Sequence, residues 1–405
     1  MKQQNTLQPK LRFPEIEGDW EKINLSEIAE IKGTKNKLNE ILPVLTNSAE
    51  KGVIKQEDFF DNQIANDKNL DSYYILDIGE FVYNPRISKH APYGPINLNK
   101  LEKGLLSPLY SIFSLKKENT LNFFLEIYFK TTLWHKYMFI EGNQGARSDR
   151  MAVGKDTLSR LPISIPSLPE QQKIADYLST IDNKINLLEE KKAQLALYKK
   201  AMMQKLFSQE IRFKPTQCHT EPVEVEPVEV ELMETYPEWE EKRLGDISKI
   251  TTGKLDANAM IPNGEYRFYT CAKEYYKIDK YAFDCEALLI SGNGANVGYI
   301  HHYKGKFNAY QRTYVLTDLA QNFEFIKYQL DQFLHIRISR EKKEGNTPYI
   351  VLSTLTEMLL KIPIKQEQQK IADFLSAIDE SIEKVNEQIS QTQSFKKAML
   401  QQMFV

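Results

Sequence analysis

Apolar side chains recur at alternating intervals of three and four residues in two long segments of the chain, residues 170–207 and 367–404. This spacing lines them up along one side of a helix and is typical of a coiled-coil seam. Each segment is roughly three times as long as an ordinary globular helix of about 11 or 12 residues, which favours long paired helices over two ordinary core helices. The predicted seam residues are Ile174, Leu178, Ile181, Ile185, Leu188, Leu195, Met202 and Leu206, and then Ile371, Leu375, Ile378, Ile382, Val385, Ile389, Met399 and Met403.

The two segments are near copies of each other. Residues 170–182 and 367–379 are identical at 11 of 13 positions with a constant offset of 197, and residues 199–207 align with 396–404 at the same offset. A constant length between both ends indicates an element whose reach depends on residue count, as that of a helix does. Polar residues interrupt the distal half of the seam, where looser packing or a contribution from another chain is expected: Lys192, Lys199, Thr392 and Lys396.

Residues 1–160 are predicted to form a first globular unit of mixed helices and strands. Runs of β-branched and aromatic residues bounded by turn residues predict strands at 73–78, 80–83 and 109–115. Helices are expected at 25–31 and 120–140, and a polar, glycine-containing loop follows at 141–150.

Residues 236–360 repeat this outline with a different interior. Residues 238–247 parallel 19–28, with Trp, Leu and Ile at a shared offset of 219. Strand-like stretches around glycine turns occur at 287–299 and 305–316, an aromatic helix is expected at 323–338, and a polar loop follows at 340–348. The chain therefore alternates unit, helix, unit, helix.

Two copies of such a module are expected to close with pseudo-two-fold symmetry, which makes the helices antiparallel. The predicted fold class is α+β: two α/β domains separated by two long helices that form an antiparallel coiled coil. The expected segments are a first domain at 1–160, a first spacer helix at 161–214, a linker at 215–235, a second domain at 236–360 and a second spacer helix at 361–405.

The net charge of −2 conceals an uneven distribution. Residues 215–241 carry nine acidic side chains and no lysine or arginine, and they contain Glu-Pro-Val-Glu-Val twice in succession. Such a composition cannot build a core, so it predicts a flexible acidic linker, with a decoy for DNA-binding surfaces as the alternative. The parts outside this tract are mildly basic.

The cysteines and the hydropathy indicate a compartment. Cys218, Cys271 and Cys285 are an odd count with no metal or redox spacing. No apolar run is long enough to span a bilayer, and the polar start of the sequence has no signal-peptide pattern. A protein of the reducing cytoplasm is expected.

Catalytic motifs are largely missing, so no catalytic or metal-binding residue is predicted. The sequence has no Gly-x-x-x-x-Gly-Lys-[Ser/Thr] phosphate loop. Asn84-Pro-Arg86 lacks the second proline and the aromatic residue of the adenine-methyltransferase motif. The glycine-rich residues 292–298 match a dinucleotide loop only weakly and are interpreted as a turn. His301 and His302 lack nearby residues at metal-ligand spacing.

The duplicated helix start Glu-Gln-Gln-Lys-Ile-Ala-Asp-x-Leu-Ser-x-Ile-Asp, the helix end Lys-Lys-Ala-Met-x-Gln and the preceding Ile-Pro resemble the specificity (S) subunit of type I restriction-modification systems, across essentially the whole chain. The resemblance implies two target-recognition domains that each read half of a split asymmetric site in double-stranded DNA. It also implies a non-catalytic role in phage defence, with two methyltransferase subunits and restriction subunits as partners. Any S-adenosylmethionine, ATP and magnesium would then be used by those partners, and no cofactor is expected in this chain.

Within this resemblance, the helix pair is predicted to act as a ruler. Helices of 35 to 38 residues span about 50 to 57 Å, and major grooves on one face of DNA recur at about 34 Å. Units that lean in from the helix ends could therefore read grooves about one turn apart.

Base and phosphate contacts are expected from polar loop residues. The DNA-binding candidates are Lys35, Arg86, Lys89, Tyr93, Asn143, Gln144, Arg147 and Arg150 in the first unit, and Lys254, Asn293, Asn296, Lys304, Lys306, Tyr310, Arg312, Lys342, Lys343 and Asn346 in the second.

Off-seam residues that are identical in both helices predict a surface for one partner bound twice. The candidates are Gln171, Gln172, Asp176 and Asp182, with Gln368, Gln369, Asp373 and Asp379. Two other functions stay open: a coiled-coil adaptor that does not read DNA, and a self-contained nuclease or methyltransferase.

Overall fold

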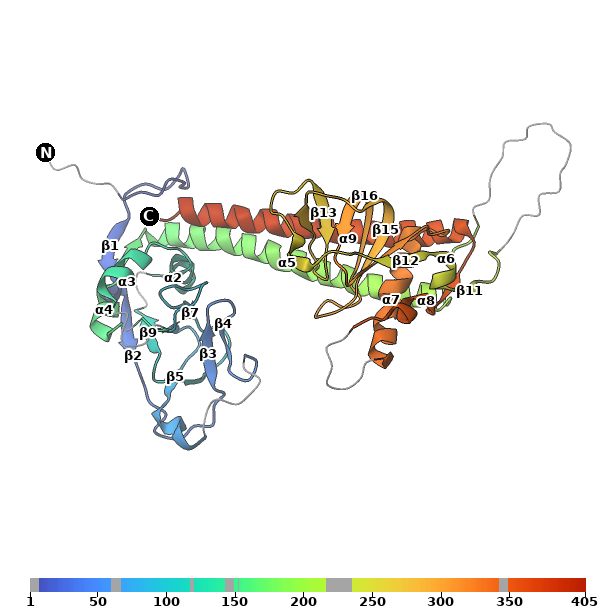
Figure 1. The fold of residues 1–405 in the computed structure, drawn as a ribbon. Helices are drawn as coiled ribbons and strands as arrows, with labels where there is room; N and C mark the ends of the chain where they lie inside the picture. The colour runs from blue at the N-terminus through green and yellow to red at the C-terminus, as the bar shows by residue number, and fades with distance from the viewer. Residues whose placement is uncertain are drawn as a thin grey trace. The chain divides into compact units, whose positions relative to one another are not determined.

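The computed structural model describes residues 7–59, 67–116, 120–142, 149–151, 153–215, 235–341 and 349–405. The chain divides into two compact units, one of Met1–Leu187 with Gln388–Val405 and the other of Leu188–Glu387. Each unit contains one α/β domain together with segments of two long helices, α5 (Leu168–Phe207) and α9 (Lys365–Gln402) (Figure 1). The predicted acidic linker lies almost entirely outside the described residues.

The first unit is built on a four-stranded antiparallel sheet in the order β2-β9-β6-β7. Further antiparallel pairs accompany it. The expected strands at 73–78, 80–83 and 109–115 are confirmed as β5, β6 and β9. The strands are β1 (Glu21–Asn24) with β10 (Pro162–Ile165), β3 (Leu45–Ser48) with β4 (Gly52–Lys55), β5 (Tyr74–Leu76) with β8 (Gly104–Leu106), and, in the larger sheet, β2 (Ala29–Lys32), β6 (Phe81–Tyr83), β7 (Ile96–Leu98) and β9 (Ser111–Leu115).

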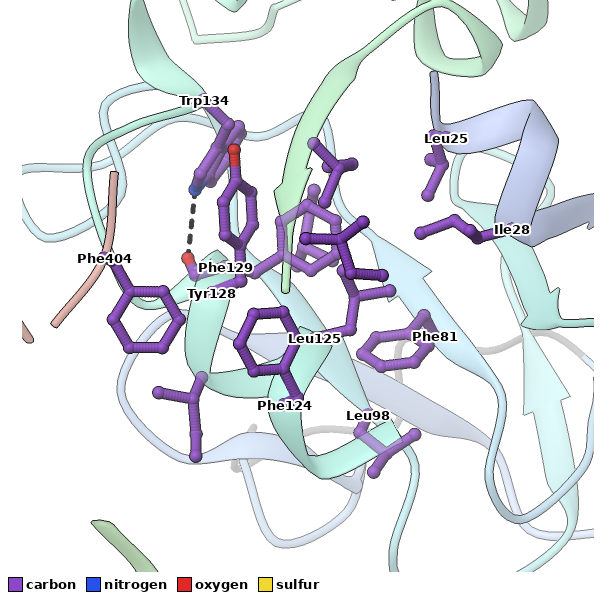
Figure 2. Packing of buried hydrophobic residues seen from close by; sticks show 14 of the residues in the cluster. Leu25, Ile28, Phe81, Leu98, Phe124, Leu125, Tyr128, Phe129, Trp134 and Phe404 are labelled. Atoms are coloured by element: carbon purple, nitrogen blue, oxygen red, sulfur yellow. Dashed lines mark hydrogen bonds between the residues drawn. The ribbon is translucent and has the colours of Figure 1, made fainter. Parts of the chain in front are cut away.

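Aromatic rings form the centre of the first core. Phe81 and Phe113 lie opposite each other in the sheet and stack at 5.1 Å, and Phe129 of α2 (Asn122–Phe129) packs edge-on against both. Phe404, just beyond the end of α9, stacks on Phe124 at 5.5 Å (Figure 2). The end of the second long helix is therefore part of the first hydrophobic core. The unit also contains η1 (Asp67–Ser72), α3 (His135–Glu141) and α4 (Lys155–Ser159).

The single helix predicted at 120–140 is wrong, because the chain breaks it into α2 and α3. Side chains in the break take over the carbonyl groups at the end of α2. The Thr131 hydroxyl donates to the Tyr128 carbonyl oxygen at 2.7 Å. The Trp134 indole N–H donates to the Phe129 carbonyl oxygen at 3.1 Å (Figure 2). These bonds satisfy groups that a helix end leaves free, and they stabilise the break.

The helix predicted at 25–31 is also too long. Helix α1 (Leu25–Ile28) ends where β2 begins at Ala29, which pairs with Leu115 in the sheet. Pairing with a distant strand satisfies backbone groups that would otherwise form hydrogen bonds within a longer helix. The local sequence pattern does not indicate this pairing.

The second unit contains a six-stranded sheet in the order β12-β17-β15-β16-β13-β14, with β13 and β16 parallel and the other neighbours antiparallel. The sheet curls, since Leu255 beyond β12 forms a parallel bridge with Tyr310 beyond β16. A Cβ at Gly253 would lie 1.9 Å from the Ala309 carbonyl oxygen, so this approach requires glycine. The strands are β12 (Lys249–Thr252), β13 (Tyr266–Tyr269), β14 (Tyr276–Ile278), β15 (Phe283–Ser291), β16 (Ile300–Ala309) and β17 (Thr313–Thr317).

Helix α7 (Phe323–Glu341) packs against β15 and β16 and confirms the helix expected at 323–338. Its buried residues, Phe325 and Leu330 among them, join Leu288 and Ile290 of β15 in the second core. A separate antiparallel pair joins β11 (Glu240–Arg243) to β18 (Leu359–Ile362). The short elements α6 (Leu244–Ile247), η2 (Ala257–Ala259) and α8 (Leu352–Thr356) complete the unit.

The segments of α5 and α9 in the first unit run antiparallel. Tyr177 of α5 contacts the sulfur of Met399, and Asp182, farther along α5, pairs with Lys396, which comes earlier in α9. Residue numbers therefore increase in opposite directions along the two helices, which confirms the predicted antiparallel arrangement. Every predicted seam residue of both helices is buried or half-buried, so the seam is confirmed.

The segments of α5 and α9 in the second unit show the same direction and explain lysines within the seam. Lys199 Nζ lies 2.7 Å from both carboxylate oxygens of Asp379, and Lys192 Nζ donates to Asn386 Oδ1 at 2.6 Å. These lysines are paired across the helices, so loose packing is not needed to accommodate them.

A buried glutamate at the start of each long helix holds an arginine that is distant in sequence. Glu170, 1% exposed, accepts hydrogen bonds from Arg12 at 2.9 and 2.7 Å. Glu367, 0% exposed, accepts them from Arg212 at 3.1 and 2.8 Å. The phenylalanine after each arginine packs edge-on against a ring of the same helix. Sequence comparison missed this repeat because the arginines are offset by 200 residues instead of 197.

Candidate nucleic-acid interface and partner surface

Two arginines of the first unit come together on neighbouring extended segments. Arg86 and Arg150 form an antiparallel bridge, supported by a hydrogen bond from the Ile87 N–H to the Asp149 carbonyl oxygen at 3.0 Å. Arg86 is exposed, and the Nε of Arg150 has no hydrogen-bond partner among the described residues. The sequence candidates at 86 and 150 therefore lie side by side in the fold.

The other candidates of the first unit are more scattered. Lys35 and Lys89 are exposed, and Lys35 forms a backbone bridge with Tyr74. Tyr93 is half-buried, and its ring lies 5.0 Å from that of His135 at the edge of the core, so it has a packing role. Asn143, Gln144 and Arg147 lie outside the described residues.

Several candidates of the second unit gather around the turn between β15 and β16. Asn296 Nδ2 donates to the Cys271 carbonyl oxygen at 3.0 Å, and the N–H of Gly292, next to Asn293, donates to the Arg312 carbonyl oxygen at 2.9 Å. The interpretation of residues 292–298 as a turn is confirmed. Arg312 is exposed and extends the polar surface of this turn.

The remaining described candidates lie nearby on the same sheet. Tyr310 is half-buried at the bridge that closes the sheet, and Lys254 is exposed beside it. Lys304 and Lys306 are exposed on β16. Lys342, Lys343 and Asn346 lie outside the described residues.

Sequence reasoning missed a cluster of arginine and tyrosine on β13 and its neighbours. The guanidinium carbon of Arg267 lies 4.3 Å from the ring centroids of both Tyr275 and Tyr303. The Arg267 Nη1 donates to the Tyr269 hydroxyl at 3.3 Å, and this bond is the main reason that its pKa is raised. The signal in the sequence was the alternation of tyrosine with basic residues at 266–269 and 275–277. Arginine and tyrosine together are suited to contacts with nucleic acid.

The adjacent histidines are held by protein groups. His302 lies between two carboxylates, 2.6 Å from Glu324 and 3.0 Å from Glu286, and the hydrogen bond with Glu324 is the main reason that its pKa is raised. Burial lowers the pKa of His301, whose Nε2 contacts the Ala272 carbonyl oxygen at 3.0 Å. Across the described ranges, no group of three or more His, Cys, Asp or Glu side chains is arranged to hold a metal ion.

The same exposed polar pair occurs near the start of both long helices. Gln172 donates to Asp176 at 2.8 Å, and Gln369 donates to Asp373 at 2.7 Å. In the first unit, the residues of this pair line a hollow of about 380 Å³ with the first residues of α2, including the half-exposed Phe123. Four predicted partner-binding residues thus lie on solvent-facing surfaces.

The sequence predicted that Gln171 and Gln368 face solvent, but each is only 1% exposed. The Gln171 amide donates to the Pro166 carbonyl oxygen at 2.9 Å and accepts from the Leu121 N–H at 3.0 Å. Gln368 does the same between Pro363 and Asn322, at 2.8 and 2.9 Å. Each glutamine ties the start of α2 or α7 to the start of its long helix.

Asp182 and Asp379 are half-buried and face the opposite long helix. Each carboxylate pairs with the seam lysine across from it, Lys396 or Lys199. The Tyr328 hydroxyl also donates to Asp379 at 2.7 Å. Helix pairing therefore accounts for their identity in both copies without a bound partner.

A sequence model of the type I restriction modification DNA specificity domain matches residues 17–197 and 236–392, most of the chain. The chain belongs to this family. The two matched segments correspond to the duplication seen in the sequence. No helix in the described part of this DNA specificity chain is long and apolar enough to cross a membrane.

Named relatives are specificity subunits. The EcoDI specificity subunit of Escherichia coli is 37% identical over 165 residues, which are 40% of this chain and 36% of that protein. The MjaIX specificity subunit of Methanocaldococcus jannaschii is 25% identical over 308 residues, 71% of this chain and 69% of that protein. The EcoDI match therefore spans about a third of that relative's length.

Solved structures share the fold along nearly the whole chain. The type I restriction-modification S subunit from M. genitalium matches with a TM-score of 0.59 at 15% identity, covering 98% of this chain and 99% of that one. A chain from a structure on complex assembly of a type I system matches with a TM-score of 0.56 at 14% identity, covering 96% and 98%. These likenesses support the predicted α+β architecture with its two long helices.

Proposed function

We propose that this chain is the non-catalytic DNA specificity subunit of a type I restriction-modification complex. In this role each unit reads one half of a bipartite, asymmetric DNA site. The observation that carries the proposal is that the specificity domain occurs twice, at 17–197 and 236–392, on two units with the same helix contacts and different sheets.

The two units share the same contacts around the long helices but differ in their sheets, which fits this role. Both units contain the same frame of three features around the long helices: a buried glutamate paired with an arginine (the Glu–Arg clasp, Glu170 with Arg12 and Glu367 with Arg212), a buried glutamine and a paired seam lysine. The sheets differ, since the first unit has a four-stranded antiparallel sheet and the second a six-stranded mixed sheet. A fixed frame preserves assembly while different surfaces read different sequences.

The repeated exposed pairs, Gln172 with Asp176 and Gln369 with Asp373, support two copies of one methyltransferase subunit as partners. Restriction subunits would join the same complex. S-adenosylmethionine, ATP and magnesium would be used by those subunits. The DNA-binding role of Arg86, Arg150, Arg312 and the other polar candidates is part of this proposal.

Exchange of one unit tests the function. Residues 236–360 are replaced by the corresponding domain of another specificity subunit, and the methylome is sequenced in cells that also express the methyltransferase partner. One half of the methylated motif should change while the other half stays the same. A change in both halves would contradict independent reading. A chain that assembles with its partner and directs no sequence-specific methylation would favour an adaptor.

A further inference from the structure

We propose that Arg267 is a specificity-determining residue of the second unit, where its guanidinium pairs with one guanine of the half-site. The inference deepens the proposed function and rests on it. Such a role requires that the guanidinium is held in one plane, that it has free hydrogen-bond donors, and that the side chains around it are suited to contact DNA.

The surroundings of Arg267 fix the plane of its guanidinium. Tyr275 and Tyr303 each lie within 4.3 Å of the guanidinium carbon, close enough for the flat cation to stack on an aromatic ring. The Tyr269 hydroxyl, whose residue is almost fully buried, accepts one hydrogen bond from Nη1. The side chain therefore loses little conformational freedom when it binds a ligand.

Arg267 also keeps most of its hydrogen-bonding capacity. Within the described residues, no carboxylate lies within ion-pair distance of it, in contrast to Arg12 and Arg212, which each hold a buried glutamate. A guanidinium has five N–H donors, and the bond to Tyr269 uses one. The remaining donors are available to acceptors of a ligand.

Guanine fits this donor arrangement. Its O6 and N7 are coplanar acceptors in the major groove, which a planar guanidinium can meet with two parallel hydrogen bonds. Arginine can bind phosphate with two hydrogen bonds as well, but a phosphate contact carries no sequence information and lysine can supply it. Lys277 is paired with Arg267 on the same face of the sheet, and its Nζ lies 5.9 Å from the ring centroid of Tyr275, so a flanking cation is available for the backbone.

The test compares Arg267→Ala and Arg267→Lys with the control Lys277→Ala, which removes a cation that is paired with Arg267 across β13 and β14 and lies on the same face of the sheet. Each full-length chain is expressed with its methyltransferase partner, and the methylome is sequenced. Both Arg267 variants should relax one G·C position in one half-site by about 10-fold or more while the other half-site is read as before. Lys277→Ala should reduce methylation evenly at all sites.

The unchanged half-site shows that the complex is assembled, so loss of folding is recognised. An even loss of methylation with an unchanged motif would assign Arg267 to phosphate and overturn the proposal. A wild-type two-part motif that both variants leave intact would overturn the role of Arg267 alone. A wild-type chain that directs no two-part motif would overturn the proposed function itself.

Discussion

Glu170 and Glu367 are carboxylates that the fold removes from water and compensates with one arginine each. Loss of one partner from such a pair leaves a buried charge that nothing else neutralises. The Trp239 indole N–H also donates to Glu367 at 3.2 Å, but a neutral donor cannot replace the cation. These arginines therefore anchor the segments that precede or follow the long helices.

Arg212→Ala should lower the free energy of unfolding of the second unit by about 3 kcal/mol, because Glu367 would stay buried without its cation. The measurement is urea denaturation of the purified chain. Lys384→Ala is the matched control, since its pair with Glu380 is exposed on both sides, and it should cost no more than about 0.5 kcal/mol. An equally small effect of Arg212→Ala would show that the clasp does not stabilise the unit.

His302 gives the second unit a pH dependence whose sign follows from its neighbours. Hydrogen bonds with Glu324 and Glu286 raise the pKa of His302, so this contribution to stability is fully present below about pH 6.5, the ordinary value for histidine, and is lost as the pH rises through the folded pKa. The pKa of Glu324 is lowered by His302, so its contribution is lost only as the pH falls through that lowered value.

His302→Gln should therefore destabilise the unit more at pH 5.5 than at pH 8.5. The charged groups near the site are Glu324, Glu286, Lys304 and Lys327. Urea denaturation of both proteins at both pH values measures the difference. An equal loss at the two pH values would mean that the imidazolium charge contributes nothing.

At the scale of elements, the long helices could be predicted because their signal is local and repeated. The break between α2 and α3 could not, because it depends on side-chain bonds that the aromatic pattern conceals. The Arg267 cluster was missed for a related reason, since it joins residues from 267, 275 and 303 through strand pairing that no local pattern specifies.

Identity between the two helix copies was informative but had more than one cause. It marked Gln171 and Gln172 equally, although one is buried and holds a neighbouring helix while the other is exposed. Sequence alone cannot separate these cases, because the same glutamine suits a buried hydrogen bond and a docking surface.

The exposed pairs give an element-scale prediction. Asp176→Lys combined with Asp373→Lys should weaken assembly with the methyltransferase subunit by at least about 10-fold, because reversed charges would oppose a partner fitted to both acids. Co-purification at several salt concentrations measures assembly, and thermal unfolding of the free chain should stay unchanged. The control reverses the exposed helix residues Glu189 and Glu387. Normal assembly of the first variant would remove this surface from the proposal.

At the scale of the whole molecule, the register of the helix pair specifies where its length can be changed. The pair of Asp182 with Lys396 lies within the first unit, before Leu188 on α5 and after Ile389 on α9, and the pair of Lys199 with Asp379 lies within the second unit, after Leu188 and before Ile389. One heptad inserted after Leu188 and after Ile389 therefore preserves the seam and the cross-helix pairs. It lengthens each helix by about 10 Å.

If helix length sets the distance between the half-sites, these insertions should move them apart by up to about three base pairs, at about 3.4 Å per base pair. Each half-sequence should stay the same, because neither recognition unit is altered. Three base pairs also rotate one half-site by about 100° around a duplex of about 10 to 10.5 pairs per turn, so total methylation should fall. The decisive measurement is the spacing within the sites that are still methylated in cells expressing the lengthened chain. Full methylation at the original spacing would mean that the helices do not set the distance, and the spacing would then have to come from the recognition units alone.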